Sequence, residues 1–209
     1  MTTEEKTASL AKIAQEISAF KGLDIAKNCT HPVPGEGNPD ALVLFVGEGP
    51  GATEDLTGRP FVGQAGKLLE KALSSINLTR SDVYITNVVK FRPPDNRDPF
   101  PEEIAACASW LDKQIDIIRP KIIATLGRFS MAKFIPDVTI SKVHGQSRFV
   151  DFLGQRYIIF PMYHPAAALR SGDMMSAFML DFAKLGQLLV PAPVVSYNSP
   201  PPPAQTSLF

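Results

Sequence analysis

The sequence contains few cysteines, no net charge and no long apolar run. Two cysteines in 209 residues, Cys29 and Cys107, argue against a disulfide framework and against a zinc site built from cysteines. Lysine and arginine together number 21, as do aspartate and glutamate, which argues against a protein that coats nucleic acid by charge alone. No apolar run approaches the roughly 18 residues of a membrane span, and the N-terminus lacks the pattern of a secretory signal. These absences predict a soluble protein of a reducing, cytoplasmic compartment, with no membrane partner.

What the sequence does contain is an alternation of strand and helix patterns. Apolar residues at helical spacing predict a first helix over residues 7–20. Short runs rich in β-branched and aromatic residues predict strands over residues 41–47, 82–89, 121–127 and 156–162. Helical patterns follow them over residues 64–76, 101–118, 128–134 and 174–189. Apolar strands alternating with helices are typical of a parallel sheet between helical layers, so residues 1–190 are predicted to form a three-layer α/β/α sandwich with a central four-stranded, mainly parallel sheet.

The residues that follow each predicted strand are candidates for a site, because ligands of such sheets lie beyond the carboxyl ends of the strands. The first strand leads into the glycine turn GEGPG and then to Phe61, the second ends near Asn87, and the fourth precedes His164. The cations that flank these residues are Lys90, Arg92, Arg97, Arg128 and Arg170. An aromatic face, an amide, an imidazole and surrounding cations suit a planar heterocycle joined to a phosphodiester chain.

Three longer segments around these residues resemble the family 4 uracil-DNA glycosylases. They are GEGPG with the following EDLTGRPFVGQAG, the segment TNVVKFRPPDNRDP, and HPAAALR, and the likeness extends from about residue 35 to residue 189. Each segment alone is a weak signal, whereas three in the right order are specific. The resemblance implies a monomeric DNA repair enzyme that flips uracil out of DNA and hydrolyses its N-glycosidic bond, leaving an abasic site.

The resemblance also implies roles for single residues of the pocket. Phe61 should stack on the flipped uracil, and Asn87 should pair with the Watson–Crick edge of the base. His164 should stabilise the base as it leaves with negative charge. Glu48 is the candidate for positioning the attacking water, with Asn87 as the alternative, because the aspartate that does this in better-known relatives is replaced here by Gly49. Backbone amides of the turn around Gly49 should contribute to binding the base.

Other positions are implied to contact the base or the DNA. Glu54 should crowd the C5 side of the ring and so help to reject thymine. Leu169 or Arg170 should fill the gap that the flipped nucleotide leaves in the duplex. The residues expected to contact DNA are Lys90, Arg92, Arg97, Leu169 and Arg170.

Family 4 enzymes usually hold a [4Fe–4S] cluster on four cysteines, and this sequence departs from that pattern. Alignment of the neighbouring motifs places Phe20, Leu23 and Phe91 at three of the four positions and retains only Cys107. One thiolate cannot hold a cluster that needs about four. The sequence therefore predicts an enzyme without a cluster, metal or other cofactor, with a small hydrophobic plug where the cluster would lie.

Residues 191–209 differ from the rest of the chain because they are rich in proline and carry no charge. This composition predicts an extended tail that does not join the core. Its last residues, QTSLF, resemble the sliding-clamp-binding motif of bacteria, in which a glutamine and a terminal Leu-Phe pair enter a groove on the clamp. The resemblance implies that Gln205, Leu208 and Phe209 bind a bacterial sliding clamp, which would place the protein in the bacterial cytoplasm and nucleoid.

Two other functions are compatible with these motifs. Small changes in the pocket alter the substrate within the superfamily, so a glycosylase for hypoxanthine or xanthine is one alternative. The second alternative is a non-catalytic member of the family that binds DNA and the clamp. The substitution at Gly49 and the missing cysteines are compatible with it. The presence of Phe61, Asn87 and His164 favours an enzyme, because an adaptor has no need of a complete base pocket.

Overall fold

Six strands form one sheet within residues 1–189, the part of the chain that the computed structural model describes. The strands are β1 (Glu36–Gly37), β2 (Val43–Gly47), β3 (Tyr84–Asn87), β4 (Ile122–Leu126), β5 (Arg148–Phe152) and β6 (Gln155–Met162). They lie in the order β1–β3–β2–β4–β6–β5, with the four inner strands parallel and the two outer strands antiparallel to their neighbours. The four predicted strands are confirmed as the parallel centre, and an edge strand on each side extends the sheet beyond the prediction.

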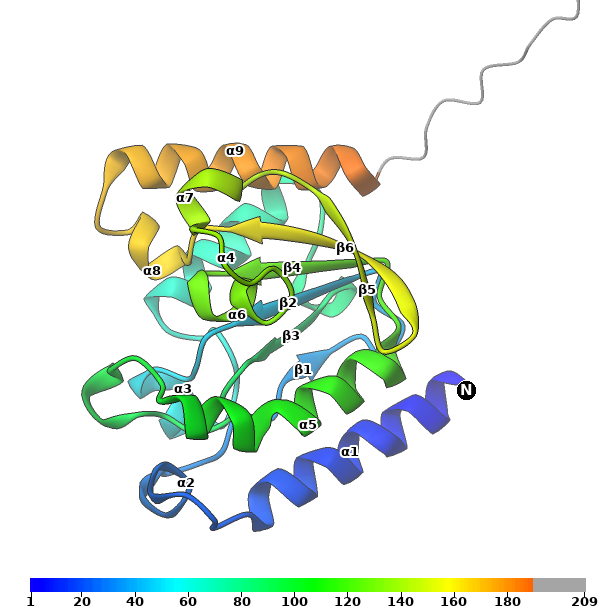
Figure 1. The fold of residues 1–209 in the computed structure, drawn as a ribbon, viewed down its shortest axis with the longest axis vertical. Coiled ribbons are helices and arrows are strands. Elements are labelled where there is room, and N and C mark those ends of the chain that lie inside the picture. Colours follow the sequence, from blue (N-terminus) through cyan, green and yellow to red (C-terminus); the bar gives the residue numbers. More distant parts are fainter. Residues whose placement is uncertain (190–209) are drawn as a thin grey trace, which may run out of the picture.

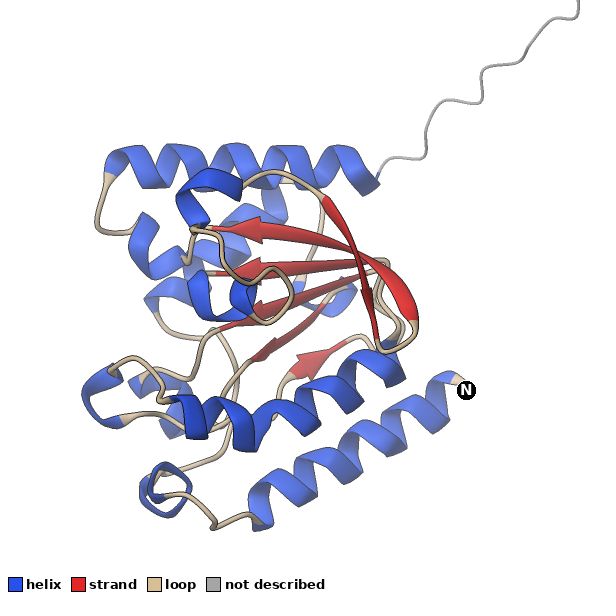
Figure 2. Ribbon diagram, viewed as in Figure 1, coloured by secondary structure: helices blue, strands red, loops and turns tan. Residues whose placement is uncertain are grey.

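Helices cover both faces of this sheet (Figures 1 and 2). They are α1 (Thr3–Ala19), α2 (Asp24–Asn28), α3 (Ala52–Thr57), α4 (Gln64–Ser75), α5 (Pro101–Ile118), α6 (Arg128–Ala132), α7 (Ile140–Val143), α8 (Pro165–Ala168) and α9 (Gly172–Leu189). Helices α1, α5, α6 and α7 share one hydrophobic core with the sheet, and α4, α8 and α9 share another. The predicted three-layer α/β/α sandwich is therefore confirmed.

Strand β2 explains how one sheet supports two cores. Its side chains alternate between the faces, so Leu44 and Val46 enter the core beneath α1 and α5, while Val43 and Phe45 enter the core beneath α4 and α9. All five residues of β2 are buried. A strand covered on both faces has to be apolar throughout, which is why this run is recognisable in the sequence.

Helix α1 begins before the predicted segment 7–20. The prediction relied on apolar spacing, and the first turn of this helix is polar. The hydroxyl of Thr2 accepts a hydrogen bond from the Glu5 backbone N–H at 3.2 Å, and the Glu5 carboxylate accepts one from the Thr2 N–H at 2.8 Å. This capping box satisfies two backbone donors that the first turn of a helix otherwise leaves unpaired. Apolar spacing alone does not reveal such a turn.

Edge strands β1 and β5 were not predicted, since both carry weak signals. β1 has two residues, and Gly37 within it adopts a φ of 132° that other residues rarely reach. β5 joins β6 through a turn at residues 153 and 154, both with positive φ, and this turn lacks the Asn-Gly pair that marks many hairpins.

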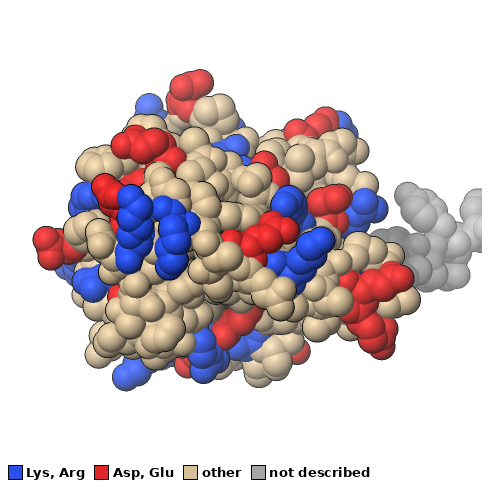
Figure 3. Space-filling view, turned by 90° about the horizontal axis from the view of Figure 1, so that it is seen from below, with Lys and Arg blue, Asp and Glu red and all other residues tan. Residues whose placement is uncertain are grey.

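Charged side chains of both signs are interspersed on the face shown in Figure 3 and form no extended patch of one sign there. This distribution agrees with a formal net charge of zero. Among residues 1–189, none of the helices combines the length and the apolar character needed to cross a membrane. The predicted tail and its residues Gln205, Leu208 and Phe209 lie outside the described residues.

Candidate active site

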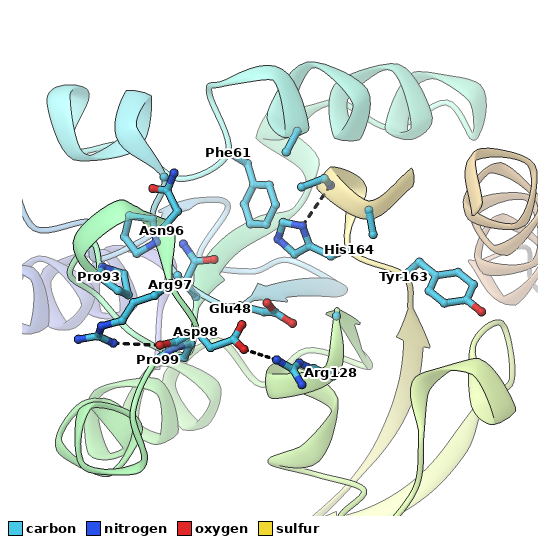
Figure 4. Close-up of a pocket in the computed structure, with 18 of the residues that line it drawn as sticks. Glu48, Phe61, Pro93, Asn96, Arg97, Asp98, Pro99, Arg128, Tyr163 and His164 are labelled. Carbon is cyan, nitrogen blue, oxygen red and sulfur yellow. Dashed lines mark hydrogen bonds and ion pairs between the residues drawn. The ribbon is translucent and has the colours of Figure 1, made fainter. Parts of the chain in front are cut away.

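The carboxyl ends of the four parallel strands meet at one edge of the sheet, where the structure contains a pocket of about 530 Å³ (Figure 4). β2 continues directly into Glu48, β3 ends at Asn87, and β6 is followed by Tyr163 and His164. The predicted site residues that line the pocket are Glu48, Gly49, Glu54, Phe61, Asn87, Arg97, Arg128, His164 and Arg170. The fold therefore gathers side chains from four separate segments around one cavity.

Asn87 lies on the floor of this pocket, beside Gly47 of the neighbouring strand. The two residues are register partners in the parallel pair β2–β3. A Cβ atom on Gly47 would lie 2.5 Å from the Phe61 ring and would also overlap the Asn87 side-chain oxygen, so only glycine leaves room for both. Asn87 is 1% exposed, and its Oδ1 atom has no hydrogen-bond partner among the described residues. A buried acceptor without a partner is costly, which makes this amide available to a ligand that brings a donor.

Phe61 and His164 lie next to each other in the wall of the pocket (Figure 4). Their ring centroids lie 5.7 Å apart, and the ring planes are inclined by 34°. Phe61 is buried and has a backbone φ of 50°, in the left-handed region that non-glycine residues seldom adopt. This conformation places the Phe61 ring beside Gly47 and close to the Asn87 side chain, where an aromatic ring can stack on a flat ligand.

His164 is the residue before helix α8, and its ring is held by that helix. Its Nδ1 atom accepts a hydrogen bond from the backbone N–H of Ala166 at 3.1 Å, so in the neutral ring the proton resides on Nε2. The surrounding protein shields the ring from water and lowers the pKa of His164 to about 4. At neutral pH the side chain is therefore an uncharged donor.

Glu48 lies at the base of the same cavity, under the loop after β4. Its Oε1 atom accepts a hydrogen bond from the Phe129 backbone N–H at 3.4 Å. Gly127 has a φ of 102°, and any side chain at that position would overlap the Glu48 carboxylate. Burial raises the pKa of Glu48 above its ordinary value. A carboxylate in this position can accept a proton from a water molecule in the cavity.

Glu54 lines the pocket, and its carboxylate also holds the loop that carries Phe61. Oε1 accepts hydrogen bonds from the backbone N–H groups of Val62 and Gly63 at 2.9 and 2.8 Å. Oε2 accepts one from the Gly51 N–H at 3.2 Å. The carboxylate thus connects two loops of the pocket wall, a role that the sequence did not suggest.

Lys90 requires a correction, because the structure does not place it where it could contact a phosphate. The side chain is fully buried, and its Nζ atom donates to Thr86 Oγ1 at 2.7 Å, to the Asn87 backbone oxygen at 2.8 Å and to Gln114 Oε1 at 2.8 Å. The segment after β3 stays buried beyond Asn87, so Lys90 points into the core and not toward the pocket rim. Lys90 therefore supports the backbone of Asn87 from behind and is not part of a DNA-facing surface.

The other predicted DNA contacts lie at or near the rim of the pocket. Arg97 pairs with Glu103 at 2.7 Å and lines the cavity. Arg92 donates to Asn96 Oδ1 at 2.8 Å and does not line it. Leu169 follows helix α8 with 48% of its surface exposed, and Arg170 beside it is exposed as well.

Among the lining residues that were not predicted as site residues, those with polar side chains are Asn96, Asp98 and Tyr163. Asp98 forms an ion pair with Arg128 and so connects the loops after β3 and β4 (Figure 4). Asn96 and Asp98 belong to the segment DNRDP, which is part of the resemblance to family 4 uracil-DNA glycosylases, but the resemblance implies no role for either residue. Tyr163 immediately precedes His164, a position that is itself a signal for proximity to the site. Its ring lies 4.3 Å from the His144 ring, with the two planes inclined by 35°.

The four positions at which the family would hold an iron–sulfur cluster converge in the structure, but their side chains do not fit one. The Phe20 ring stacks on Phe91 with 5.9 Å between centroids and meets Trp110 edge-on at 5.1 Å. Cys107 is fully buried, and Leu23 packs against the same core. No cluster of three or more potential metal-ligating side chains occurs in residues 1–189. Apolar carbon atoms fill this place, and a single thiol provides too few donors for a cluster.

Comparison with known proteins agrees with this geometry. The model of the Uracil DNA glycosylase superfamily matches residues 34–184. The chain is 47% identical over 186 residues to the type-4 uracil-DNA glycosylase of Archaeoglobus fulgidus, a match that covers 86% of this chain and 93% of that protein. It is 44% identical over 173 residues to the type-4 uracil-DNA glycosylase of Thermotoga maritima, covering 82% and 88% of the two chains. A type-5 uracil-DNA glycosylase of Pyrobaculum aerophilum is 35% identical over 153 residues, covering 65% and 66%.

Proposed function

This chain belongs to the type-4 uracil-DNA glycosylases of the uracil-DNA glycosylase superfamily, and from this membership we propose how its pocket removes uracil from DNA. The enzyme is a DNA repair hydrolase that cleaves the N-glycosidic bond of uracil and leaves an abasic site. The degree and extent of similarity to type-4 enzymes do not favour a hypoxanthine or xanthine glycosylase, nor a non-catalytic adaptor.

The observation that carries the proposal is the buried, unpaired amide oxygen of Asn87 beneath Phe61. Uracil offers a donor at N3–H, whereas cytosine has an unprotonated acceptor at the same place. An acceptor on the pocket floor therefore gains a hydrogen bond with uracil and remains unsatisfied with cytosine, a difference that discriminates strongly in a dry site. Phe61 stacks on the face of the same ring.

His164 supports departure of the base. As the bond between N1 of uracil and C1′ of the sugar lengthens, negative charge develops on the base and positive charge on the sugar. The neutral His164 ring, whose Nδ1 is occupied by the Ala166 N–H, donates from Nε2 to uracil O2. Such a donor stabilises the transition state more than the ground state, because its partner acquires charge only during cleavage.

Glu48 completes the reaction in this proposal. Its carboxylate orients a water molecule for attack on C1′, accepts a proton from that water and counters the positive charge of the sugar. The N1–C1′ bond breaks, the water oxygen bonds to C1′, and the uracil anion takes up a proton after release. Asn87 is the alternative residue for positioning this water.

The enzyme acts without an iron–sulfur cluster or metal in this proposal. The aromatic packing of Phe20, Phe91 and Trp110 supports it, since these rings occupy the space between the former ligand positions. The base pocket is built from other residues, so the chemistry does not require the cluster.

DNA is bound along the rim of the pocket. Leu169 projects from the surface next to Arg170 and is suited to fill the gap in the duplex, while Arg92 and Arg97 are placed to approach phosphates. The enzyme acts as a monomer in this proposal, because one chain supplies every residue of the pocket.

A second proposal concerns residues 191–209, which would tether the catalytic domain of residues 1–190 to a bacterial sliding clamp in the cytoplasm. Its support is the sequence alone: a proline-rich, uncharged segment gives reach, and Leu208 and Phe209 offer two apolar anchors after Gln205. Tethering raises the effective concentration of an enzyme at replication sites. Binding of the full chain to a purified bacterial clamp should be lost in the double variant Leu208→Ala/Phe209→Ala; equal binding of both proteins would refute the tether.

The catalytic proposal is tested on matched oligonucleotides that contain one uracil, hypoxanthine, thymine mismatch or cytosine, followed by alkaline cleavage. We expect cleavage at uracil, unaffected by metal chelators, and its loss in Asn87→Ala and His164→Ala. Asn28→Ala, on the exposed end of α2, is the matched control and should retain activity. Cleavage at hypoxanthine in place of uracil, or DNA binding without any cleavage, would overturn the assignment.

A further inference from the structure

The backbone that carries Phe61 is held in an unfavourable conformation. Phe61 has a φ of 50°, which costs energy for a residue with a side chain. Gly66 at the start of α4 lies directly beneath, and a Cβ atom there would overlap the Phe61 carbonyl group. Such a loop keeps its shape only when surrounding groups hold it, and the groups that do so control where the aromatic ring lies.

Arg80 holds this loop from the side opposite Glu54. Its Nη1 atom donates to the Phe61 backbone oxygen at 2.8 Å, and its Nη2 atom donates to the Pro60 oxygen at 2.6 Å. Glu54 accepts hydrogen bonds from the next two backbone N–H groups, as described above. Four consecutive residues thus have their peptide groups bound by two charged side chains of opposite sign, and hydrogen bonds to charged groups are about twice as strong as neutral ones.

Arg80 is itself fixed in place by Glu36 of β1. Arg80 Nη2 lies 2.6 Å from Glu36 Oε1, and the Arg80 side chain is 18% exposed. Glu36 also pairs with Arg59, whose Nε and Nη2 atoms lie 2.8 and 2.9 Å from its two oxygens. The short edge strand β1 therefore does more than extend the sheet. It positions the Glu36 carboxylate, which orients the Arg80 side chain toward the loop.

We propose that Arg80, oriented by Glu36, is a positioning residue that sets the stacking face of Phe61 and so controls uracil binding. This inference rests on the proposed function of the pocket. Arg80 does not line the cavity, so it reaches the pocket through its hydrogen bonds to the Pro60 and Phe61 carbonyl groups, while its ion pairs with Glu36 and with Glu70, 3.4 Å away on α4, hold it in place. Without it, the two carbonyl groups lose their donors, and the Phe61 backbone relaxes toward negative φ, which turns the ring away from His164.

The inference predicts that removing Arg80 and removing the Phe61 ring have the same consequence. Stacking of a base on an aromatic side chain contributes an amount that corresponds to about 5- to 150-fold in affinity. We therefore expect Arg80→Gln and Phe61→Ala each to lower kcat/KM on uracil DNA within that range, with most of the change in KM. The double variant should be no worse than Phe61→Ala, because Arg80 has nothing left to position.

The experiment is a double-mutant cycle with steady-state kinetics at a temperature where every variant is folded, as checked by circular dichroism. Arg59→Gln is the matched control, because its side chain pairs with Glu36 and donates no hydrogen bond to the Pro60 or Phe61 carbonyl group, and it should retain wild-type kcat/KM. Arg80→Lys keeps the charge and one donor to the loop and should recover part of the loss; it replaces Arg80→Gln in the cycle if that variant does not fold. Additive effects of the Arg80 and Phe61 substitutions, or an unchanged kcat/KM in a folded Arg80 variant, would overturn the inference. Failure of the wild-type enzyme to cleave uracil would refute the proposed function instead.

Discussion

The backbone N–H of Ala166 donates a hydrogen bond to Nδ1 of His164 over 3.1 Å, and this single contact fixes the tautomer of the ring. With Nδ1 acting as acceptor, the proton of the neutral imidazole resides on Nε2, the nitrogen available to the pocket. Protonation of Nδ1 would require this hydrogen bond to break, which agrees with a pKa lowered to about 4 by burial. His164 can therefore donate to a leaving base without first becoming charged.

The first prediction follows for the pH dependence of activity. Because the pKa of His164 is about 4, its ring stays neutral above that pH, so kcat/KM should show no inflection from His164 between about pH 5.5 and 8. The pKa of Glu48 is raised by burial, so activity should fall as the pH drops through that raised value and Glu48 takes up a proton. Glu48→Gln should have low activity, and that activity should not fall further as the pH drops through this range. If kcat/KM of Glu48→Gln falls at low pH as it does in the wild type, another group causes the fall.

Lys90 gives a second prediction, on stability. Burial lowers its pKa from 10.5 to about 7, and above that pH the neutral amine can donate only two of the three hydrogen bonds that Nζ makes as an ammonium group. Between these values the unfolded chain binds a proton that the folded protein does not, so the free energy of unfolding should rise with pH from about 7 toward 10. Lys90→Met should be less stable, since Gln114 and the Asn87 carbonyl group lose their donor, and should lack this rise.

Thermal unfolding of the wild type and of Lys90→Met between about pH 7 and 10 measures this pH dependence of stability. The surface variant Lys113→Met is the control, because the Lys113 side chain is 53% exposed and pairs with the surface residue Glu16. It should keep the pH dependence of the wild type. If the stabilities of the wild type and Lys90→Met change with pH in the same way, the pKa of Lys90 is not lowered by folding.

Asn87 and Lys90 show which features of the site can be predicted from the sequence and which cannot. Asn87 is correctly placed at the pocket, because the carboxyl end of a buried parallel strand is a fixed location in this fold. Lys90 was predicted to be one of the cations around the pocket that contact DNA, since lysine is usually exposed. Its burial depends on Gln114, which is 24 positions away in the sequence and meets it only in the folded protein.

The same limit applies to the contacts that shape the site. The residues of the segment that contains Phe61 predict a binding element, whereas its hydrogen bonds to Arg80 come from a turn 19 positions away in the sequence. Helix α5 was predicted with its observed bounds, because proline and two acidic residues mark its start and its apolar spacing is regular. Local patterns therefore predict elements, while the partners of polar side chains require the structure.

A third prediction concerns the aromatic plug formed by Phe20, Phe91 and Trp110. Phe91 is 1% exposed and contacts both other rings, so Phe91→Ala should leave a cavity and destabilise the protein by about 3–5 kcal/mol. Urea unfolding measures this, with Phe149→Ala as the control; Phe149 is 73% exposed, and its removal should change stability by no more than about 0.5 kcal/mol. Equal stability of the two variants would show that the plug does not support the fold.

The final prediction concerns Leu169 as the side chain that enters the duplex. Filling the gap left by a flipped nucleotide matters only where neighbouring base pairs must stay stacked, so Leu169→Ala should lower kcat/KM on duplex uracil DNA about tenfold and leave single-stranded DNA nearly unaffected. Arg170→Gln should instead weaken binding to both substrates and reduce its salt dependence, because a phosphate contact is lost. Competition between single- and double-stranded substrates in one reaction measures the ratio directly. Leu180, on α9 and 57% exposed, supplies the control variant Leu180→Ala, which should keep the wild-type ratio. An equal loss on both substrates in Leu169→Ala would assign Leu169 to general DNA binding and leave Arg170 as the residue that fills the gap.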